Sequence, residues 1–463
     1  MEMPKNTIAL GKDCFISRDT HVTGMNNNVL VNGGSGRGKT RGVVIPNILQ
    51  AEGSYVISDP KGNLCDTYGP YLEKKGYIVK RLDFACPEKS IHYNPLKYVL
   101  TDQDYIKLGH MLATTTSDGR AIVRQDPFWE RTSSMLMSSA IGFVKEIMEP
   151  ESQTMVTVMD FLNLIRPNDR TEDSKVEKMM SLHLKNNRPH VPFSVRQYRK
   201  VEYSSETTFR SILITTQSAL GALDTDQMRE VFRYDETDIA EIGQKKTAFF
   251  VVVSDTDRSL DVIANIFFSQ ALNELCNYAD RKCKDQCLPV PVQFIMDDFA
   301  TNCRIDSFPK MISSFRSRGI STMIIIQAES QLEAAYDKDG RTIIANCDTI
   351  LYLGGNDMET SRAMSERSNR PLEEILNLPV GKHYVFRNGE EAKLVERINI
   401  EELEEYKTAM KLCRNQSIQH MEPDQLEQPP EEYGRRYYSL SEVLKHYCFL
   451  KRHSDELDEK ILK

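Results

Sequence analysis

The 463-residue chain lacks any apolar run long enough to cross a membrane. Its most apolar stretches, residues 247–253 and 323–326, are far shorter than the roughly 20 residues of a membrane-spanning helix. Their length and composition indicate buried β-strands instead. The sequence therefore predicts a globular protein, and its length suggests two or three domains.

The chain also lacks a paired arrangement of metal-binding cysteines. Cys276, Cys283 and Cys287 lie near one another, but no neighbouring His or Cys-x-x-Cys pair completes a set of four ligands. We expect free thiols there rather than a zinc site. No secretory signal precedes the ten cysteines, which favours a reducing cytosol over a disulfide framework.

The chain also has no excess of positive charge, since its formal net charge is −8. Any DNA-contacting surface must then be a local patch and not the whole molecule. One candidate patch combines basic and aromatic residues, namely Lys185, Arg188, Phe193, Arg196, Tyr198, Arg199 and Lys200. Such a mixture can follow a phosphate backbone and stack on bases. The alternative, which we favour, is a solvated face with snorkelling side chains.

What the chain does contain is a phosphate-binding loop. Residues 29–41 read VLVNGGSGRGKTR, and residues 33–40 within them fit the pattern G-x-x-x-x-G-K-[ST]. A β-rich run precedes the pattern and a potential helix, residues 41–50, follows it, as the motif requires. The predicted nucleotide contacts are Gly33, Gly34, Ser35, Gly36, Arg37, Gly38, Lys39 and Thr40.

Each residue type in this loop has a physical task. Glycines allow the tight turn that points successive N–H groups at an anion. Lys39 can reach the β- and γ-phosphates, and the Thr40 hydroxyl can ligate Mg²⁺. The positive N-terminal end of the following helix favours the same phosphates. The motif thus predicts a site for a nucleotide with Mg²⁺.

A second nucleotide signature lies at residues 292–298, where an apolar strand ends in Asp297 and Asp298. A carboxylate at the end of a central strand can hold Mg²⁺, a role that we assign to Asp297. Its neighbour Asp298 can then orient or deprotonate the attacking water. The long separation from Lys39 indicates that another segment is inserted between the two motifs.

The order of the predicted elements gives the fold class, which is α/β with a parallel-rich central sheet. Several predicted helices in succession indicate an all-α insertion at residues 99–231. We place the two parts of the nucleotide-binding domain at residues 1–98 and 232–400, and a charged tail at residues 401–463. The turn at residues 59–62 either lies on the rim that carries Lys39 or is a plain turn.

Three polar residues near one later strand are further candidates for the site. Gln327 ends the predicted strand 320–326, where its side chain can sense a γ-phosphate. Arg316 and Arg318 precede that strand, and either could act across a subunit boundary as an arginine finger. Surface charge is the alternative for both arginines.

Taken together, these motifs resemble the TraG/TraD-type coupling ATPases of bacterial conjugation, which belong to type IV secretion. The resemblance covers roughly residues 7–400. Its carriers are GGSGRGKT (33–40), SYVISDPKG (54–62), YNPL (93–96), DPFWE (126–130), IMDDFA (295–300), RSRGIS (316–321), Gln327 with QLEAAY (331–336), NCD (346–348) and LGGNDMET (353–360). Their number and their order make the resemblance specific.

The resemblance implies a RecA-like P-loop ATPase domain interrupted by an all-α domain, with a homo-hexameric ring as the assembly. It also implies that the protein uses ATP and Mg²⁺ to bring or pump relaxase-bound single-stranded DNA to a type IV secretion channel. The expected place is the bacterial cytoplasm, at the cytoplasmic face of the cell membrane.

The family's functional residues carry over position by position. The matching residues are Lys39 and Thr40 for Walker A, Asp297 for Walker B and Gln327 for the motif III glutamine. Arg318 is the first choice for the arginine that acts on a neighbouring subunit, and Arg316 is the second. Asp298 would position the water.

Two departures from the family pattern stand out. Many members carry Asp-Glu at Walker B, whereas this chain has Asp297-Asp298. The shorter side chain withdraws the second carboxylate by one methylene, so hydrolysis is expected to be slower or to use a shifted water. Members also usually carry an N-terminal membrane anchor, and here we expect membrane attachment through a partner or a missing anchor.

Two other functions stay open at this point. One is a double-stranded DNA translocase resembling FtsK or HerA, which stimulation by double-stranded rather than single-stranded DNA would identify. The other is an adaptor that docks protein cargo at a secretion channel and uses ATP as an assembly switch. The acidic net charge favours the adaptor to some degree.

Overall fold

The fold is described from a computed structural model. It describes residues 3–114, 127–165, 175–254, 256–299, 304–305 and 307–419. Residues 1–413 form one compact unit. The part of the predicted charged tail from residue 420 onward lies outside the described residues.

The centre of the unit is a nine-stranded sheet with the order β11-β10-β9-β3-β8-β7-β4-β6-β5. All pairs from β9 to β5 are parallel, and β10 pairs antiparallel with both β9 and β11. The strands are β3 (Val29–Asn32), β4 (Ser54–Ser58), β5 (Ile78–Asp83), β6 (Thr247–Val252), β7 (Val292–Met296), β8 (Ile320–Ile326), β9 (Thr349–Tyr352), β10 (Lys382–Arg387) and β11 (Lys393–Glu396). The prediction of an α/β fold with a parallel-rich sheet is confirmed.

Different parts of the chain cover the two faces of this sheet. Successive side chains of a strand point to opposite faces, so Val29 and Val31 of β3 enter one buried cluster and Leu30 enters the other. The first cluster holds side chains of α2, α3 and α18 and of a separate hairpin, β1 (Thr7–Gly11) with β2 (Cys14–Ser17). The second holds α11 and the inserted helices.

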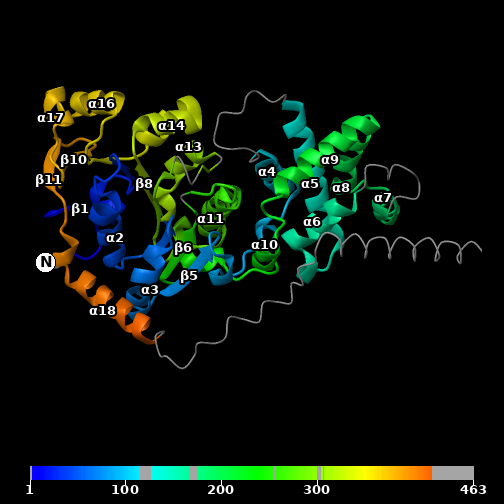
Figure 1. The fold of residues 1–463 in the computed structure, drawn as a ribbon, viewed down its shortest axis with the longest axis horizontal. Coiled ribbons are helices and arrows are strands. Elements are labelled where there is room, and N and C mark those ends of the chain that lie inside the picture. Colours follow the sequence, from blue (N-terminus) through cyan, green and yellow to red (C-terminus); the bar gives the residue numbers. More distant parts are fainter. Residues whose placement is uncertain are drawn as a thin grey trace, which may run out of the picture. The chain divides into compact units, whose positions relative to one another are not determined.

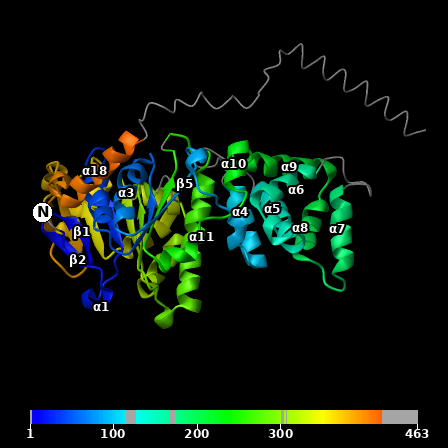
Figure 2. The ribbon, with the colours of Figure 1, turned by 90° about the horizontal axis from the view of Figure 1, so that it is seen from below.

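The inserted helices lie between β5 and β6 in the chain. They are α4 (Asp102–Thr114), α5 (Pro127–Ile147), α6 (Met155–Leu164), α7 (Lys175–Asn186), α8 (Phe193–Glu202), α9 (Glu206–Leu220) and α10 (Asp226–Val231). Figures 1 and 2 both show this group beyond α11 as seen from the sheet. Its side chains share one continuous buried cluster with that face of the sheet.

The remaining helices flank the sheet or follow its strands. They are α1 (Thr20–Thr23), α2 (Ile45–Leu49), α3 (Asn63–Lys74), α11 (Asp261–Lys282), α13 (Phe308–Met311), α14 (Glu329–Tyr336), α15 (Gly340–Ala345), α16 (Met358–Ser368), α17 (Leu372–Leu376) and α18 (Glu404–Gln419). Helix α18 lies within the predicted charged tail, residues 401–463. Leu403 and Ala409 are buried there, so the charged segment after residue 400 packs on the sheet unit.

The candidate patch of basic and aromatic residues resolves into an ordinary amphipathic helix. Phe193 and Tyr198 of α8 are buried, whereas Arg196, Arg199 and Lys200 on the same helix are exposed. The interpretation that these two aromatic rings stack on bases is therefore wrong, because no base can reach them. The exposed cations form the solvated face that we favoured, and Arg196 pairs with Asp102 at 3.1 Å.

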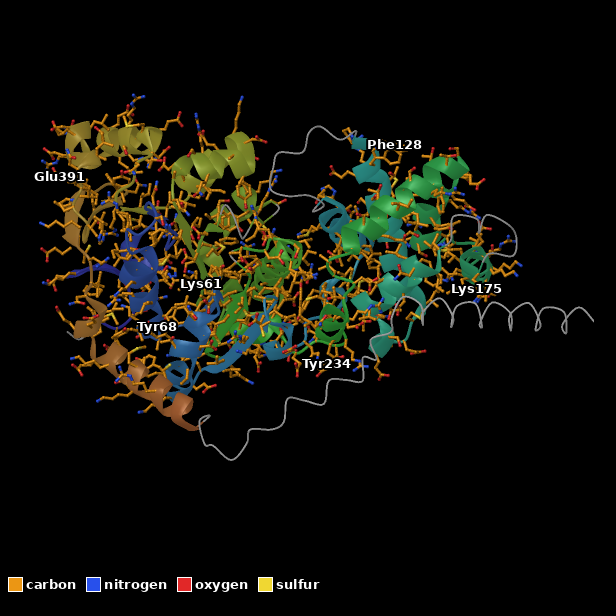
Figure 3. The ribbon with its side chains drawn as sticks, in the orientation of Figure 1. Lys61, Tyr68, Phe128, Lys175, Tyr234 and Glu391 are labelled. Atoms are coloured by element: carbon orange, nitrogen blue, oxygen red, sulfur yellow. The ribbon has the colours of Figure 1, made fainter. Side chains whose placement is uncertain are left out.

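The two chain segments that lead into and out of the inserted helices are tied together. Tyr93 N–H donates to the Val231 carbonyl at 2.8 Å, and Glu236 N–H donates to the His92 carbonyl at 3.0 Å. The Tyr234 ring, labelled in Figure 3, stacks on His92 with 3.7 Å between ring centroids. These contacts fix where the returning chain rejoins the sheet.

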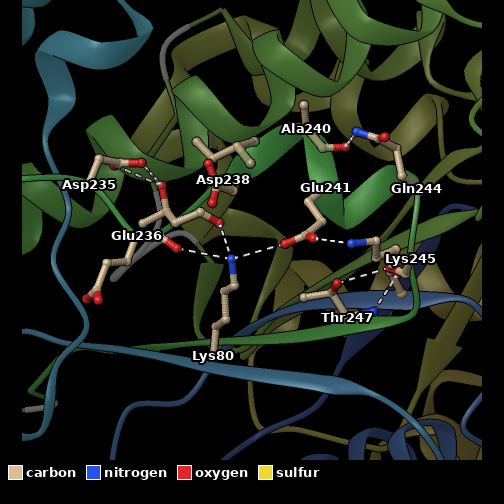
Figure 4. Close-up of polar contacts among 12 residues, drawn as sticks. Lys80, Asp235, Glu236, Asp238, Ala240, Glu241, Gln244, Lys245 and Thr247 are labelled. Atoms are coloured by element: carbon tan, nitrogen blue, oxygen red, sulfur yellow. Dashed lines mark hydrogen bonds and ion pairs between the residues drawn. The ribbon is translucent and has the colours of Figure 1, made fainter.

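Lys80 of β5 is the central cation of this junction (Figure 4). Its Nζ donates to the carbonyls of Glu236 and Thr237, both at 3.0 Å, and to the Glu241 carboxylate at 3.4 Å. Only 14% of the Lys80 side chain is exposed, so its amine is largely withdrawn from water and held by these acceptors.

Replacing Lys80 by methionine should destabilise the fold, because it leaves the two carbonyls without a donor. We expect Lys80→Met to lower the free energy of unfolding by about 1–3 kcal/mol in urea titrations. Lys245→Met is the matched control, since Lys245 pairs with the same Glu241 at 2.8 Å but is 65% exposed. The control should cost less than about 1 kcal/mol. Equal losses in the two variants would contradict a special role of Lys80.

Candidate nucleotide site

The phosphate-binding loop follows the central strand β3 and closes tightly on the strands beside it. Gly33 N–H donates to the Ile326 carbonyl at 3.1 Å, and Gly34 N–H donates to the Gly354 carbonyl at 2.9 Å. Gly36 and Gly38 have φ of +73° and +83°, a region that favours glycine. The motif glycines are therefore required by the backbone path of the loop.

Two basic side chains lie within the loop itself. Lys39 Nζ donates to the Gly33 carbonyl at 2.8 Å, so the amine lies across the loop, where it can meet a phosphate. Arg37 Nη1 donates to the Leu378 carbonyl at 3.0 Å, which holds Arg37 on the β9 side of the loop. Its guanidinium carbon lies 3.2 Å from where a Cβ atom on Gly354 would be, so this glycine of LGGNDMET makes room for Arg37.

The helix after the loop begins differently from the prediction. Residues 41–50 are predicted as one helix, but the chain forms a π-helical turn at Thr40–Val44 and then α2. Pro46, near the start of α2, has no N–H to donate to the carbonyl four residues earlier, which favours such a widened turn. The Gly42 N–H donates to the Gly38 carbonyl at 2.7 Å, so the turn begins directly on the loop.

Asp297 is brought directly to the end of the phosphate-binding loop. Thr40 Oγ1 donates to Asp297 Oδ2 at 2.9 Å, although the two residues are 257 positions apart. Asp297 is buried, and burial, together with the neighbouring charge of Asp298, raises the pKa of its carboxyl group. Thr40 and Lys39 oppose that increase. A hydroxyl beside a carboxylate fits Mg²⁺, which prefers oxygen ligands and neutralises buried negative charge.

Asp298 and Gln327 form a second pair at the same rim. Gln327 Nε2 donates to Asp298 Oδ1 at 3.4 Å, a long hydrogen bond. Asp298 has φ of +50°, a conformation that non-glycine residues adopt rarely, and its N–H donates to Asp297 Oδ1 at 3.1 Å. The turned backbone aims the two adjacent aspartates differently, one toward Thr40 and the other toward Gln327.

The turn at residues 59–62 lies next to these groups and also begins a helix. Ser58 Oγ donates to the Asp297 carbonyl at 3.5 Å, which places the end of β4 beside Walker B. Asp59 Oδ2 accepts the Cys65 N–H at 2.9 Å at the start of α3. Burial raises the pKa of Asp59 to about 6. Both interpretations of this turn are therefore partly right, since it is on the rim and it caps a helix.

The two candidate arginines lie away from this loop, at the end of the sheet where its parallel strands begin. They belong to the short turn Arg316–Arg318 that precedes β8, whereas Gln327 follows β8. Arg318 is held by both oxygens of Asp280, at 2.8 and 2.9 Å. Arg316 is exposed and donates to the Thr20 carbonyl at 3.1 Å. Neither arginine serves the phosphate-binding loop of its own chain.

Sequence reasoning missed Arg397, which follows β11 and lies against the phosphate-binding loop. A Cβ atom on Gly38 would lie 3.3 Å from its guanidinium carbon, and one on Gly42 would lie 2.6 Å from its Cγ. The only signal in the sequence was Gly42 itself, since glycine is unfavourable in a helical turn unless something approaches closely. The partner of that glycine could not be read from the pattern.

A parallel-rich sheet with a G-x-x-x-x-G-K-T loop after a central strand, and an aspartate from a nearby strand on its threonine, defines a RecA-like P-loop NTPase. The sequence family described as type IV secretory system conjugative DNA transfer matches residues 4–368. The chain belongs to that family, which confirms the resemblance to conjugative coupling proteins. No curated protein sequence matches the chain.

Solved structures share the fold at low sequence identity. The bacterial conjugative coupling protein TrwB, as TrwBdeltaN70 with sulphate, has a TM-score of 0.61 at 14% identity, over 86% of this chain and 90% of TrwB. TrwB in complex with ADP and Mg²⁺ has a TM-score of 0.59 at 16% identity, with the same coverage. VirB4 of Thermoanaerobacter pseudethanolicus has a TM-score of 0.51 at 15% identity, over 86% of this chain and 97% of VirB4.

Within the described ranges, every helix is either too short or too polar to cross a bilayer.

Proposed function

We propose that this member of the conjugative DNA transfer family is an ATP-driven coupling protein whose motor is the site between β3, β7 and β8. The observation that carries the proposal is the Thr40–Asp297 hydrogen bond, because it joins Walker A to Walker B in the arrangement that binds a magnesium nucleotide. TrwB, which shares the fold, binds ADP with Mg²⁺, and this supports the same ligands here.

Different residues of the site contact the phosphates and the Mg²⁺ ion of the nucleotide. The backbone N–H groups of residues 33–38 and the Lys39 amine hold the phosphates, which Lys39 reaches by leaving the Gly33 carbonyl. Thr40 and Asp297 supply oxygen ligands for Mg²⁺. The raised pKa of Asp297 fits this role, because a bound cation stabilises the ionised carboxylate.

Hydrolysis requires a water that is held in line with the terminal phosphate. Asp298 accepts a proton or a hydrogen bond from that water, and Gln327 fixes its orientation. The 3.4 Å separation of the two side chains leaves Asp298 able to turn toward the water. Because Asp298 is one methylene shorter than glutamate, we expect hydrolysis to be slower or to use a shifted water.

Assembly into a ring, with a hexamer as the expected form, would supply the missing arginine. The prediction from sequence placed Arg318 first and Arg316 second. The bidentate Asp280 pair favours the reverse order, since Arg318 would have to leave an ion pair to reach a neighbour. Arg316 is exposed and gives up only one backbone carbonyl.

The cargo of this motor is single-stranded DNA bound to a relaxase, and its destination is a type IV secretion channel. We propose the cytoplasmic face of the bacterial membrane as the place of action, with attachment through a partner or an anchor. Family membership supports these assignments.

ATP hydrolysis should increase with protein concentration and with single-stranded DNA, because the site is completed only by a neighbour. Lys39→Ala should abolish turnover at every concentration, as it removes the cation that meets the β- and γ-phosphates. The measurement is phosphate release across a concentration series, with and without DNA. Stronger stimulation by double-stranded DNA would favour an FtsK- or HerA-like translocase. Tight ATP binding without turnover under any condition would favour the cargo adaptor.

Arg316→Ala should lower the hydrolysis rate of the assembled protein by roughly 10³-fold or more, since the guanidinium stabilises transition-state charge. ATP binding by isolated subunits should be unchanged. Arg318→Ala is the matched control from the same turn, and it should lower stability by removing the Asp280 pair while leaving more of the rate. A larger rate loss in Arg318→Ala at equal folding would restore the original order.

A further inference from the structure

Arg397 stands over the phosphate-binding loop with its charge uncompensated within the described part of the chain. No hydrogen bond or ion pair joins its half-buried guanidinium to another described residue, although it does influence the titration of His383. Its side chain lies in the space left free by Gly38 and Gly42. Arg397 therefore packs against two glycines and is not a fully solvated surface charge.

The order of the strands tells which end of a nucleotide Arg397 would meet. Asp298 and Gln327 follow β7 and β8, on one side of β3, and they define the side of the terminal phosphate. Arg397 follows β11, on the other side of β3, beyond β9 and β10. A nucleotide whose γ-phosphate faces β8 therefore extends its α-phosphate toward the Arg397 side.

The other described cations near that end of the loop are each held by an acceptor. Lys39 lies across the loop on the Gly33 carbonyl, and Arg37 is held by the Leu378 carbonyl. Arg41, one residue beyond Thr40, pairs with Glu401 at 2.5 Å. Arg397 is thus the cation near Gly38 that is not engaged by an acceptor in the described residues.

We infer that Arg397 binds the α-phosphate of the nucleotide, as a further binding residue of this site. The inference rests on the proposed nucleotide-binding function and goes beyond it by assigning a residue outside the phosphate-binding loop and Walker B. Gly42 is present because a side chain there would displace Arg397. The segment after β11 then senses the nucleotide directly, and Glu401 of the same segment contacts the loop helix through Arg41.

The test compares ADP with inorganic phosphate, measured by calorimetric titration of the full chain with Mg²⁺ present. A single phosphate held by Lys39 and the loop has no second phosphoryl group to reach Arg397. Arg397→Ala should weaken ADP binding about tenfold or more and leave phosphate binding unchanged. Lys393→Ala, an exposed cation of β11, is the control and should leave both affinities as in the parent.

Gly42→Ala is a second variant, and it should weaken ADP binding without destabilising the helix. Alanine is the better helix former, yet its Cβ would take the place of the Arg397 side chain. It should therefore weaken ADP binding as Arg397→Ala does, without a lower melting temperature in the absence of nucleotide.

The outcomes distinguish a failure of the Arg397 inference from a failure of the proposed function. An unchanged ADP affinity in Arg397→Ala would overturn the inference, and so would equal losses for ADP and inorganic phosphate, which would mean that Arg397 only supports the loop. A parent protein that binds neither ligand would instead overturn the proposed function. Loss of ADP affinity alone, in both variants, supports the α-phosphate contact.

Discussion

The hydrogen bond from Thr40 to Asp297 is the contact on which the rest of the structure depends. It requires that β3 and β7 end at the same edge of one sheet, which parallel strands ensure. Strand β8 lies between β3 and β7, and this order brings Gln327 to the neighbouring Asp298. A buried carboxylate is costly unless it is hydrogen-bonded or binds a cation, and this cost is why we propose Asp297 as a ligand of Mg²⁺.

The position of the inserted helices follows from the same constraint. The chain leaves the sheet after β5, at its edge, and returns at β6, the adjacent strand. A large insertion there does not disturb the central strands that carry the phosphate-binding loop and Walker B. The Lys80 junction holds the entering and leaving segments together, so the insertion joins the unit at one defined place.

Much of this arrangement could be predicted from sequence, because it depends on local patterns. Apolar runs followed by Gly-rich or acidic residues predicted β3, β7 and β8 and the side chains at their ends. Periodic apolar residues predicted the inserted helices. What could not be predicted depends on contacts between distant residues. The Asp280 partner of Arg318, the burial of Phe193 and Tyr198, and the approach of Arg397 to Gly42 all arise only when the chain is folded. The π-helical turn was missed because the helix pattern of residues 41–50 outweighed Pro46.

The Mg²⁺ dependence of ADP binding tests the central claim most directly. Titrations with and without Mg²⁺ should show that Mg²⁺ strengthens binding to the parent protein. In Thr40→Val and Asp297→Asn, most of that gain should disappear, while the Mg²⁺-free affinity persists because Lys39 and the loop backbone are intact. If both variants kept the full gain from Mg²⁺, the Thr40–Asp297 pair would not be the metal site, and this account of the motor would be wrong.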